Sequence, residues 1–286
     1  MTISIIGGGR IGSAIAHVLK ETVLITDVDP HKSNTTKSHK EVIKEGDVIF
    51  VCIPTEMVGG VCKDIAKINN KNAPVVFLSK GLNKKGETVF EIAEKILKKR
   101  VVMMCGPMMA EDIVENGNAY AVCAGIEKKN VVKVLNLFHG TKIHCMGSDD
   151  PRGLSLLSVA KNVYATLSGV GDGLHAGANV RGVIVKGALC EMEILMKLGK
   201  GKLDTVYSYA GIADLVCTVT SPHSRNRSYG ESLITHESSV IGEGAKAIVA
   251  FHKRFYKQIK KLPLLRATYE IIKDNKNAAK ILDTIR

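Results

Sequence analysis

Short apolar runs alternate with longer amphipathic segments along the first half of the chain. Runs of this length that are rich in Val and Ile are typical of buried strands, and the segments between them have the apolar spacing of helices. The expected strands are Thr2–Ile6, Thr22–Thr26, Val48–Ile53, Val75–Leu78, Val101–Cys105, Tyr120–Cys123 and Lys142–Cys145. The expected helices are Arg10–Lys20, Val58–Ile68, Val89–Lys98 and Asn130–Phe138. This alternation predicts parallel strands with helical crossovers, which is a doubly wound α/β sheet.

The strand pattern stops after about Ser148. Beyond it the apolar positions follow helical spacing only, over Leu154–Ser168, Asn179–Leu198, Tyr209–Val219, Asn226–Leu233 and Gly244–Lys260. We therefore expect an all-α C-terminal domain after the α/β domain, with the boundary near Gly147–Pro151. This division assigns residues 1–148 to the first domain and residues 149–286 to the second, and both sizes are ordinary for domains.

The composition is that of a folded protein. The 286 residues are 45% hydrophobic, which excludes a disordered or collagen-like chain. No apolar run approaches the roughly 20 residues of a membrane helix, and the start MTISIIGGGR lacks the basic region of a secretory signal. The seven cysteines are an odd number without a Cys-x-x-Cys pair, which predicts reduced thiols in a cytoplasmic protein. No Cys or His spacing suggests a metal site.

The net charge of +12 is unevenly distributed. Residues 1–148 contribute +5, residues 149–252 contribute zero and residues 253–286 contribute +7. The basic segment FHKRFYKQIKKLPLLRATYEIIK has helical spacing, so we expect its lysines on a solvated helix face. The alternative is a polyanion-binding face. Because the chain has no nucleic-acid-binding motif, no nucleic-acid partner is expected.

A glycine-rich turn follows the first expected strand and opens the first expected helix. In GGGRIG, Gly7 permits a tight turn, Gly9 lets a pyrophosphate approach the backbone, and Gly12 lets the helix pack against the strand. Asp27 ends the next strand, where a carboxylate suits a ribose 2′-hydroxyl and repels a 2′-phosphate. Asp29 is an alternative for that role. The motif predicts a dinucleotide site that prefers NAD to NADP, and a glycine-rich turn without a nucleotide is the structural alternative.

Two lysines are candidates for chemistry. Lys80 follows an expected strand in PVVFLSKGL, so its ammonium is expected at the carboxyl edge of the sheet, where ligands bind in open α/β folds. Lys161 lies in an apolar and small-residue helix, next to Ser158 and Asn162. A lysine among apolar neighbours is costly unless it is paired or functional. The alternatives are a surface charge for Lys80 and, for Lys161, a side chain that reaches water from the helix edge.

The stretch AGIADLVCTVTSPHSRNR combines several polar groups. Asp214 and Thr218 are four residues apart and therefore share a helix face. Ser221-Pro222 resembles a helix N-cap followed by proline at the first helical position. The N–H groups of that helix start are expected to form an anion site together with the side chains of Ser224, Arg225, Asn226 and Arg227. The alternative is a basic helix start without a ligand.

Six segments, in this order, resemble the NAD(P)-dependent glycerol-3-phosphate dehydrogenases over most of the chain. They are GGGRIG, SKGL, GPMMAED, VAKNVYATLSGVGDGLHAGANVRG, AGIADLVCTVTSPHSRNR and VIGEG, and the block from Asp214 to Arg227 is the most specific. The resemblance implies a Rossmann-like dinucleotide-binding domain followed by a helical domain for substrate binding and dimerisation. It also implies a small phosphorylated substrate, and commonly a homodimer.

The resemblance further implies roles for individual residues. Lys161 falls at the family's proton-transferring lysine, and Lys80 and Asp214 complete the implied catalytic set. The implied substrate-binding residues are Lys80, Gly106, Asp214, Thr218, Ser224, Arg225 and Asn226. The implied cofactor-binding residues are Gly7, Gly9, Arg10, Ile11, Gly12, Asp27, Lys80, Ala110, Arg225, Ile241 and Glu243.

The chain departs from the family pattern at three places. Between the second and third expected strands only the short segment from His31 to Gly46 remains, on the adenosine side of the cofactor site. Met108 stands where many members have a small hydroxyl residue. The acidic pair Glu111-Asp112 puts a carboxylate one position from its usual place, or shortens the side chain that carries it. These changes leave room for a different phosphorylated substrate.

We therefore expect reversible hydride transfer between NAD(H) and dihydroxyacetone phosphate, which gives sn-glycerol 3-phosphate, with Lys161 as general acid and base. Two alternatives stay open. One is a sibling reductase that acts on another small anionic 2-oxo or 2-hydroxy compound, as a ketopantoate reductase does. The other is a non-catalytic protein that senses NAD or binds nucleic acid through its basic C-terminal helices.

Overall fold

The computed structural model describes residues 1–69, 71–115, 117–236 and 243–285. The chain forms two compact units, each with its own core. Unit 1 comprises Met1–Lys80 and Thr88–Ser155, and unit 2 comprises Gly81–Glu87 and Leu156–Arg286. The division after Ser155 falls inside helix α7 (Pro151–Gly173). We refer to unit 1 as the sheet unit and to unit 2 as the helical unit.

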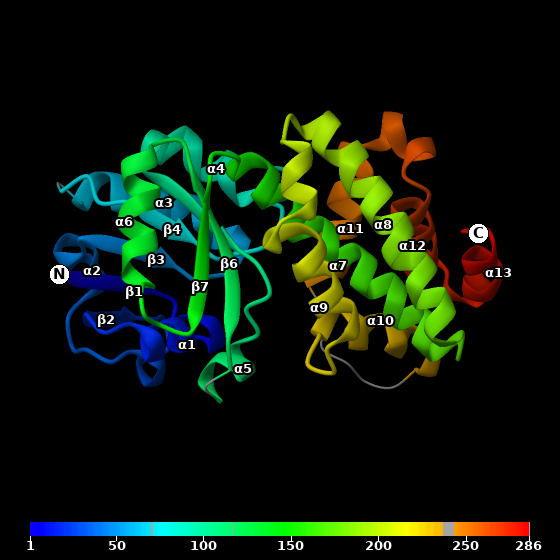
Figure 1. Ribbon diagram of the computed structural model, residues 1–286, viewed down its shortest axis with the longest axis horizontal. Coiled ribbons are helices and arrows are strands. Elements are labelled where there is room, and N and C mark those ends of the chain that lie inside the picture. Colours follow the sequence, from blue (N-terminus) through cyan, green and yellow to red (C-terminus); the bar gives the residue numbers. More distant parts are fainter. Residues whose placement is uncertain (70, 116, 237–242, 286) are drawn as a thin grey trace. The chain divides into compact units, whose positions relative to one another are not determined.

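A seven-stranded sheet forms the centre of the sheet unit, in the order β2-β1-β3-β4-β5-β6-β7 (Figure 1). Its strands are β1 (Thr2–Ile6), β2 (Thr22–Thr26), β3 (Val48–Val51), β4 (Val75–Phe77), β5 (Val101–Cys105), β6 (Ala119–Gly125) and β7 (Ile143–Ser148). All seven runs expected as strands are strands, which confirms the doubly wound α/β class. The expectation of an all-parallel sheet is wrong at one place, because β6 pairs with β5 in the antiparallel direction. The described residues of the connection between these two strands include the five-residue helix α5, and β6 starts at the same edge of the sheet at which β5 ends.

Helices cover both faces of this sheet. They are α1 (Arg10–Val18), α2 (His39–Glu45), α3 (Thr55–Ile68), α4 (Val89–Leu97), α5 (Ala110–Val114) and α6 (Lys128–Leu137), with 3₁₀ turns at Pro30–Lys32 and Lys98–Arg100. Residues of α1 and α6 share one apolar cluster with alternate strand residues such as Ile3 and Ile5. Helices α2, α3 and α4 pack together on the opposite face. In Figure 1, α6 lies in front of the sheet and α3 lies behind it.

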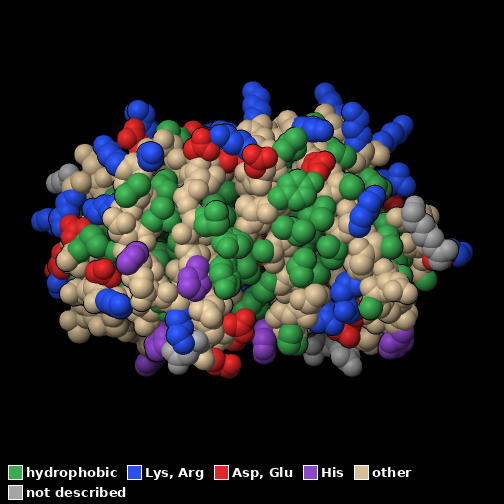
Figure 2. All heavy atoms as spheres, in the orientation of Figure 1, with side chains coloured by type: hydrophobic (Ala, Val, Ile, Leu, Met, Phe, Trp, Pro, Cys, Tyr) green, Lys and Arg blue, Asp and Glu red, His purple; other side chains and the backbone are tan. Residues whose placement is uncertain are grey.

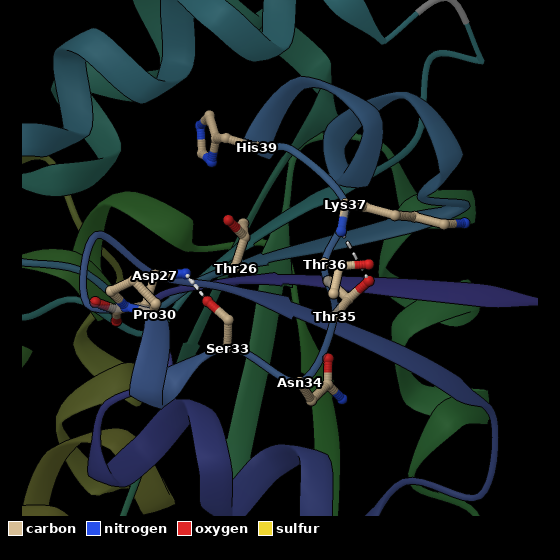
Figure 3. A pocket seen from close by; sticks show the side chains of 9 residues that line it. All are labelled: Thr26, Asp27, Pro30, Ser33, Asn34, Thr35, Thr36, Lys37 and His39. Atoms are coloured by element: carbon tan, nitrogen blue, oxygen red, sulfur yellow. Dashed lines mark hydrogen bonds between the residues drawn. The ribbon is translucent and has the colours of Figure 1, made fainter.

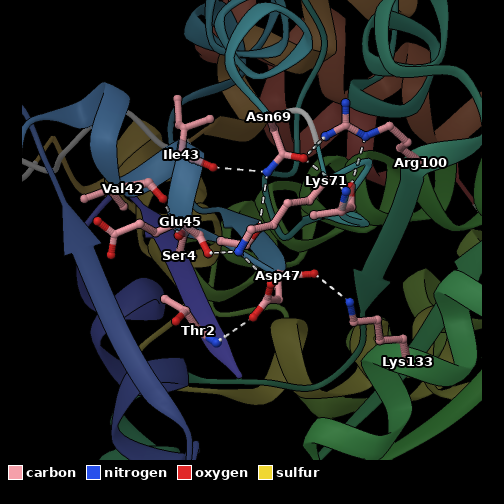
Figure 4. Close-up of polar contacts among 12 residues, drawn as sticks. Thr2, Ser4, Val42, Ile43, Glu45, Asp47, Asn69, Lys71, Arg100 and Lys133 are labelled. Atoms are coloured by element: carbon pink, nitrogen blue, oxygen red, sulfur yellow. Dashed lines mark hydrogen bonds and ion pairs between the residues drawn. The ribbon is translucent and has the colours of Figure 1, made fainter.

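Polar contacts stabilise the edge of the sheet at the amino-terminal ends of the strands (Figure 4). The Asp47 carboxylate accepts the Thr2 N–H at 2.9 Å and a hydrogen bond from the Lys71 Nζ at 2.8 Å. The Lys71 ammonium holds the pKa of Asp47 below its usual value. The buried Asn69 amide donates to the carbonyl oxygens of Ile43 and Gly46. These contacts fix the edge away from the glycine-rich turn, which leaves the carboxyl ends of the strands available for ligands.

The helical unit packs around α7, whose residues 156–171 are all buried. Its other helices are α8 (Gly177–Gly199), α9 (Asp214–Thr220), α10 (Arg225–Thr235), α11 (Glu243–Arg254), α12 (Pro263–Lys273) and α13 (Ala278–Asp283). Leu203–Tyr207, Tyr256–Lys261 and Asn275–Asn277 are 3₁₀ turns, and Tyr209–Ala213 is a π-helical turn. The all-α expectation for this part of the chain is confirmed.

The basic C-terminal segment is less regular than its spacing predicts. The expected helix Gly244–Lys260 ends at Arg254, and α12 starts at Pro263. Leu262 has φ −126° and ψ 64°, as expected where the following proline disfavours helical backbone. Seven cations between residues 253 and 280 are exposed, namely Lys253, Lys257, Lys260, Lys261, Arg266, Lys273 and Lys280. Figure 2 shows Lys and Arg side chains on the surface of the helical unit. Their exposure agrees with a solvated face. None of the helices among the described residues is long and apolar enough to cross a membrane.

Candidate functional site

The glycine-rich turn joins β1 to α1 with very close backbone contacts. Gly7 has φ +104°, and a Cβ there would lie 2.5 Å from the Cys52 carbonyl oxygen. A Cβ at Gly12 would lie 2.0 Å from the Gly7 carbonyl oxygen. Packing within the fold therefore requires glycine at both positions. At Gly9, in contrast, a Cβ would meet no atom of the described residues within 4 Å.

The amino terminus of α1 is suited to an anion. Gly9 is its N-cap and provides no side-chain cap, and the first turn has no acidic residue. The N–H groups at the start of a helix carry partial positive charge and bind phosphate when no side chain occupies them. Arg10 occupies the first position of α1, where its guanidinium forms a 2.7 Å ion pair with Glu111 of α5, and Ile11 packs against the apolar cluster.

Asp27 lies at the end of β2, beside this turn. Its Oδ2 accepts the Gly8 N–H at 2.7 Å, and its Oδ1 accepts the Asp29 N–H at 3.0 Å. The Asp29 carboxylate accepts the His31 N–H at 3.1 Å and pairs with Lys32 at 3.0 Å, and this lysine lowers the pKa of Asp29. Asp29 therefore caps the 3₁₀ turn, whereas Asp27 lines the neighbouring pocket.

This open pocket has a volume of about 1080 Å³ (Figure 3). Its lining residues are Thr26, Asp27, Pro30, Ser33, Asn34, Thr35, Thr36, Lys37 and His39. The Lys37 ammonium forms a 2.5 Å ion pair with Glu45, and burial lowers the pKa of His39. Glu45 thus compensates the charge of Lys37, and burial favours the neutral form of His39, while Asp27 lines the same pocket.

Two loops at the carboxyl edge of the sheet carry further predicted residues. Lys80 is half-buried and follows Ser79, whose hydroxyl donates to the Ile53 carbonyl oxygen at 2.5 Å. Gly106 follows β5, where a Cβ would lie 2.2 Å from the Tyr120 carbonyl oxygen, so the approach of β6 alone requires glycine there. Met108 is buried in the apolar cluster, and Ala110 is the first residue of α5.

The helical unit contains a buried cation held by two side chains. Lys161 of α7 is 5% exposed, and its Nζ donates to Asp214 Oδ1 at 2.5 Å and to Thr218 Oγ1 at 2.9 Å. The Thr218 hydroxyl in turn donates to the Asp214 carbonyl oxygen at 2.6 Å. A lysine that reached water from the helix edge would be exposed, so that alternative is wrong.

Local backbone geometry places Asp214 in this cluster. The π-helical turn Tyr209–Ala213 precedes α9, which starts at Asp214. Such turns are rare in proteins, and those that occur are often found at functional sites. The expectation that Asp214 and Thr218 share a helix face is confirmed, because both contact the same ammonium.

The helix that carries Arg225 and Asn226 starts later than Ser221-Pro222. Ser221 instead ends α9, where its N–H donates to Cys217, and its hydroxyl accepts the His223 N–H at 3.1 Å. Ser224 is the N-cap of α10, and its hydroxyl accepts the Arg227 N–H. The predicted Ser221 cap is therefore wrong. Arg225 is exposed at the first helical position and Asn226 is half-buried at the second, so both stay at a helix start.

Of the two late cofactor candidates, Ile241 lies outside the described residues and Glu243 is the first residue of α11. Sequence reasoning also missed two carboxyl groups in the helical unit, of which Asp172 is partly buried and Glu191 is buried. Asp172 pairs with Arg181 and Arg227. Glu191 is 2% exposed and accepts hydrogen bonds from the Tyr164 hydroxyl and from two N–H groups at the start of α12.

Burial raises the pKa of Glu191 to about 7, although all three hydrogen bonds act in the opposite direction. In the sequence, the signal that could have pointed to Glu191 is its position among the apolar residues of ALCEMEILM.

The chain is similar to known proteins over most of its length. The family profile described as NAD-dependent glycerol-3-phosphate dehydrogenase N-terminus matches residues 25–132, and the corresponding C-terminus profile matches residues 150–283. The chain is 26% identical to glycerol-3-phosphate dehydrogenase [NAD(P)+] of Phytoplasma mali, over 100% of this chain and 97% of that protein. It is 28% identical to the Halothermothrix orenii protein of the same name, over 96% of this chain and 91% of that protein.

A solved structure shares the fold. The crystal structure of glycerol-3-phosphate dehydrogenase from Coxiella burnetii superposes with a TM-score of 0.90 at 22% identity, over 99% of this chain and 98% of that chain. Together the two profiles span both the sheet unit and the helical unit. The chain belongs to the NAD-dependent glycerol-3-phosphate dehydrogenase family.

Proposed function

We propose that this protein catalyses reversible hydride transfer between NAD(H) and dihydroxyacetone phosphate, giving sn-glycerol 3-phosphate, with Lys161 as the general acid and base. The observation that carries the proposal is the buried Lys161 ammonium, which Asp214 and Thr218 hold in place. Bound NADH supplies the hydride that reduces the substrate carbonyl carbon. Lys161 then gives its proton to the oxygen of that carbonyl, so the product alcohol receives one hydride and one proton.

The environment of Lys161 favours this role. A charge with 5% exposure stabilises a developing alkoxide more strongly than a solvated charge does. Asp214 compensates the buried charge, and Thr218 fixes the direction of the ammonium through its own hydrogen bond to α9. In the oxidation of glycerol 3-phosphate the same lysine, after losing its proton, accepts the hydroxyl proton.

The start of α10 is the proposed phosphate site. Ser224, Arg225 and Asn226 occupy its N-cap and first two positions, where backbone N–H groups favour an anion. An arginine fork matches the geometry of a phosphate group. We assign Gly106 and Lys80 to further substrate contacts, and Lys80 and Arg225 also to the cofactor, as the family resemblance implies.

The proposed cofactor is NAD rather than NADP. The two closely packed glycines and the uncapped start of α1 suit a pyrophosphate, and the absence of protein atoms around a Cβ at Gly9 leaves space for it. The pocket beside Asp27 suits an adenosine ribose. A 2′-phosphate there would meet the Asp27 carboxylate, while the Lys37 ammonium is already paired with Glu45.

The cofactor proposal has a matched pair of variants. Asp27→Asn removes the charge that repels a 2′-phosphate, so the ratio of kcat/KM for NADPH to that for NADH should rise by about tenfold. Asp29→Asn, two residues away, is the control, because the Asp29 carboxylate caps a turn and pairs with Lys32. A wild-type protein that uses NADPH as well as NADH would contradict the proposed preference.

The substrate proposal is tested by measuring oxidation of NADH and NADPH with dihydroxyacetone phosphate and with several 2-oxo acids, including ketopantoate. We expect turnover with dihydroxyacetone phosphate and competition by inorganic phosphate. Turnover with a 2-oxo acid that is indifferent to phosphate would instead support the sibling reductase. Nucleotide binding without any turnover would support a non-catalytic protein.

A further inference from the structure

Helix α10, which carries the proposed phosphate site, contacts α7 through backbone atoms. A Cβ at Gly169 of α7 would lie 1.9 Å from the Arg227 carbonyl oxygen, and a Cβ at Gly230 of α10 would lie 1.9 Å from the Thr166 carbonyl oxygen. The two helices therefore cross without intervening side chains. Because α7 also carries Lys161, this crossing fixes the first turn of α10 relative to the proposed proton donor.

An ion pair reinforces this crossing. Asp172, one turn after Gly169 on α7, accepts a hydrogen bond from the Arg227 Nε at 2.6 Å through its Oδ2. The Arg227 Nη1 also donates to the Ser221 carbonyl oxygen at 3.4 Å, in the turn before α10. The side chains of Asp172 and Arg227 are 14% and 22% exposed. Such a partly buried, charge-assisted contact is stronger and more directional than a surface pair.

The two arginines of the Ser-Arg-Asn-Arg sequence thus differ in environment. Arg225 is exposed, whereas the Arg227 guanidinium is committed to Asp172. Arg227 is also the residue whose N–H donates to the hydroxyl of the N-cap Ser224. The Asp172 contact therefore fixes both the side chain and the backbone of the helical turn that contains Arg225 and Asn226.

We propose that Asp172 is a positioning residue for the substrate phosphate, and that it acts through Arg227 on the first turn of α10. This inference rests on the proposed function, since it takes the α10 start as the phosphate site. Recognition of a phosphate by several donors depends on their relative placement, and a displacement of about 1 Å can cost about 100-fold in rate. Because the Arg227 guanidinium is held by Asp172, the exposed Arg225 is the arginine of this turn that we assign to the phosphate.

Arg181 of α8 provides a matched control. Its Nη2 donates to the other oxygen of Asp172 at 2.5 Å, but it lies on a different helix from the phosphate site. Arg181→Ala removes one ion pair of Asp172 and leaves the pair with Arg227. A purely structural role of Asp172 predicts similar kinetic effects of losing either arginine, whereas a positioning role predicts an effect through Arg227 alone.

The experiment measures kcat, the KM for dihydroxyacetone phosphate, the KM for NADH and inhibition by inorganic phosphate. For Asp172→Ala and Arg227→Ala we expect the KM for dihydroxyacetone phosphate and the inhibition constant of phosphate to rise together by about 10-fold or more. The KM for NADH should rise less than the KM for dihydroxyacetone phosphate, because Arg225 is the one residue of this turn that is also assigned to the cofactor. In the double variant Asp172→Ala with Arg227→Ala, the rises in KM should not add, because both substitutions remove the same ion pair. For Arg181→Ala both KM values should stay within about twofold of the wild type.

Asp172→Asn and Arg227→Lys keep part of the contact and should give smaller shifts of the same kind. If the alanine variants do not fold, the same measurements on these two conservative variants test the proposal. An unchanged KM for dihydroxyacetone phosphate in the Asp172 variants, or an equal rise in Arg181→Ala, would overturn the positioning role while the proposed function stands. A wild-type protein that does not reduce dihydroxyacetone phosphate would overturn the proposed function and this inference with it.

Discussion

Replacing Glu191 by Gln should remove a pH dependence from the stability of the helical unit. The folded protein holds this carboxyl group at a pKa of about 7, against 4.5 for an ordinary glutamic acid. Because the folded state binds the proton more tightly, the stabilisation is fully present below about pH 4.5 and is lost as the pH rises through about 7. Between about pH 5 and about pH 8, this linkage amounts to about 2.5 kcal/mol of unfolding free energy.

The assay is urea unfolding of the wild type and Glu191→Gln at several pH values, followed by circular dichroism and by tyrosine fluorescence, which no Trp obscures. The quantity of interest is the unfolding free energy of the wild type minus that of the variant. We expect this difference to fall by about 2.5 kcal/mol from about pH 5 to about pH 8, because other titrating groups cancel in the subtraction.

Glu193→Gln is the matched control for this measurement. Glu193 lies on the same helix and also accepts a hydrogen bond from a tyrosine, but that partner, Tyr207, is 59% exposed. Because water reaches the Tyr207–Glu193 contact, this variant should follow the wild type over the same pH range. A difference for Glu191→Gln that is flat with pH, or that rises with pH, would refute the reasoning from burial.

Two further substitutions test the packing of the helical unit. Asp214→Asn leaves the buried Lys161 ammonium without the Asp214 carboxylate and should cost about 3–5 kcal/mol in urea unfolding; a cost below about 1 kcal/mol would contradict a buried ion pair. Gly230→Ala should cost about 1–3 kcal/mol, because its Cβ would lie 1.9 Å from the Thr166 carbonyl oxygen. Its control is Gly182→Ala in α8, where a Cβ meets no atom within 4 Å in the part of the chain that the structure describes, and a gain of up to about 1 kcal/mol is expected. Equal costs for the two glycine substitutions would contradict the close crossing of α7 and α10.

Local periodicity predicted most of the sheet unit, because its strands are short, mostly apolar and separated by amphipathic helices. Thr2–Ile6, Thr22–Thr26 and Val101–Cys105 have the expected bounds. The direction of β6 was not predictable in this way, since strand direction depends on the connection rather than on the apolar pattern. The short helix α2, which starts with a capping box at Ser38, lies in a polar segment whose spacing gave no helical signal.

The candidate site was predictable where sequence neighbours share a helix face. The four-residue spacing of Asp214 and Thr218 predicted their common side, but their common partner Lys161 is 53 residues from Asp214 and follows only from tertiary packing. The same limit explains why Asp172 was missed: its partner Arg227 lies 55 residues away. The start of α10 was misplaced because two serines precede it, and only tertiary context selects Ser224 over Ser221 as the cap.

The most direct test of the proposed chemistry is the turnover of Lys161→Ala with dihydroxyacetone phosphate and NADH, together with its affinity for NADH. The double variant Lys161→Met with Asp214→Asn removes both buried charges and controls for the burial of an unpaired carboxylate. If Lys161 transfers the proton, kcat should fall by about 100-fold or more in both variants, while NADH binding changes by less than about twofold. Turnover close to that of the wild type in either folded variant would contradict the central role of Lys161.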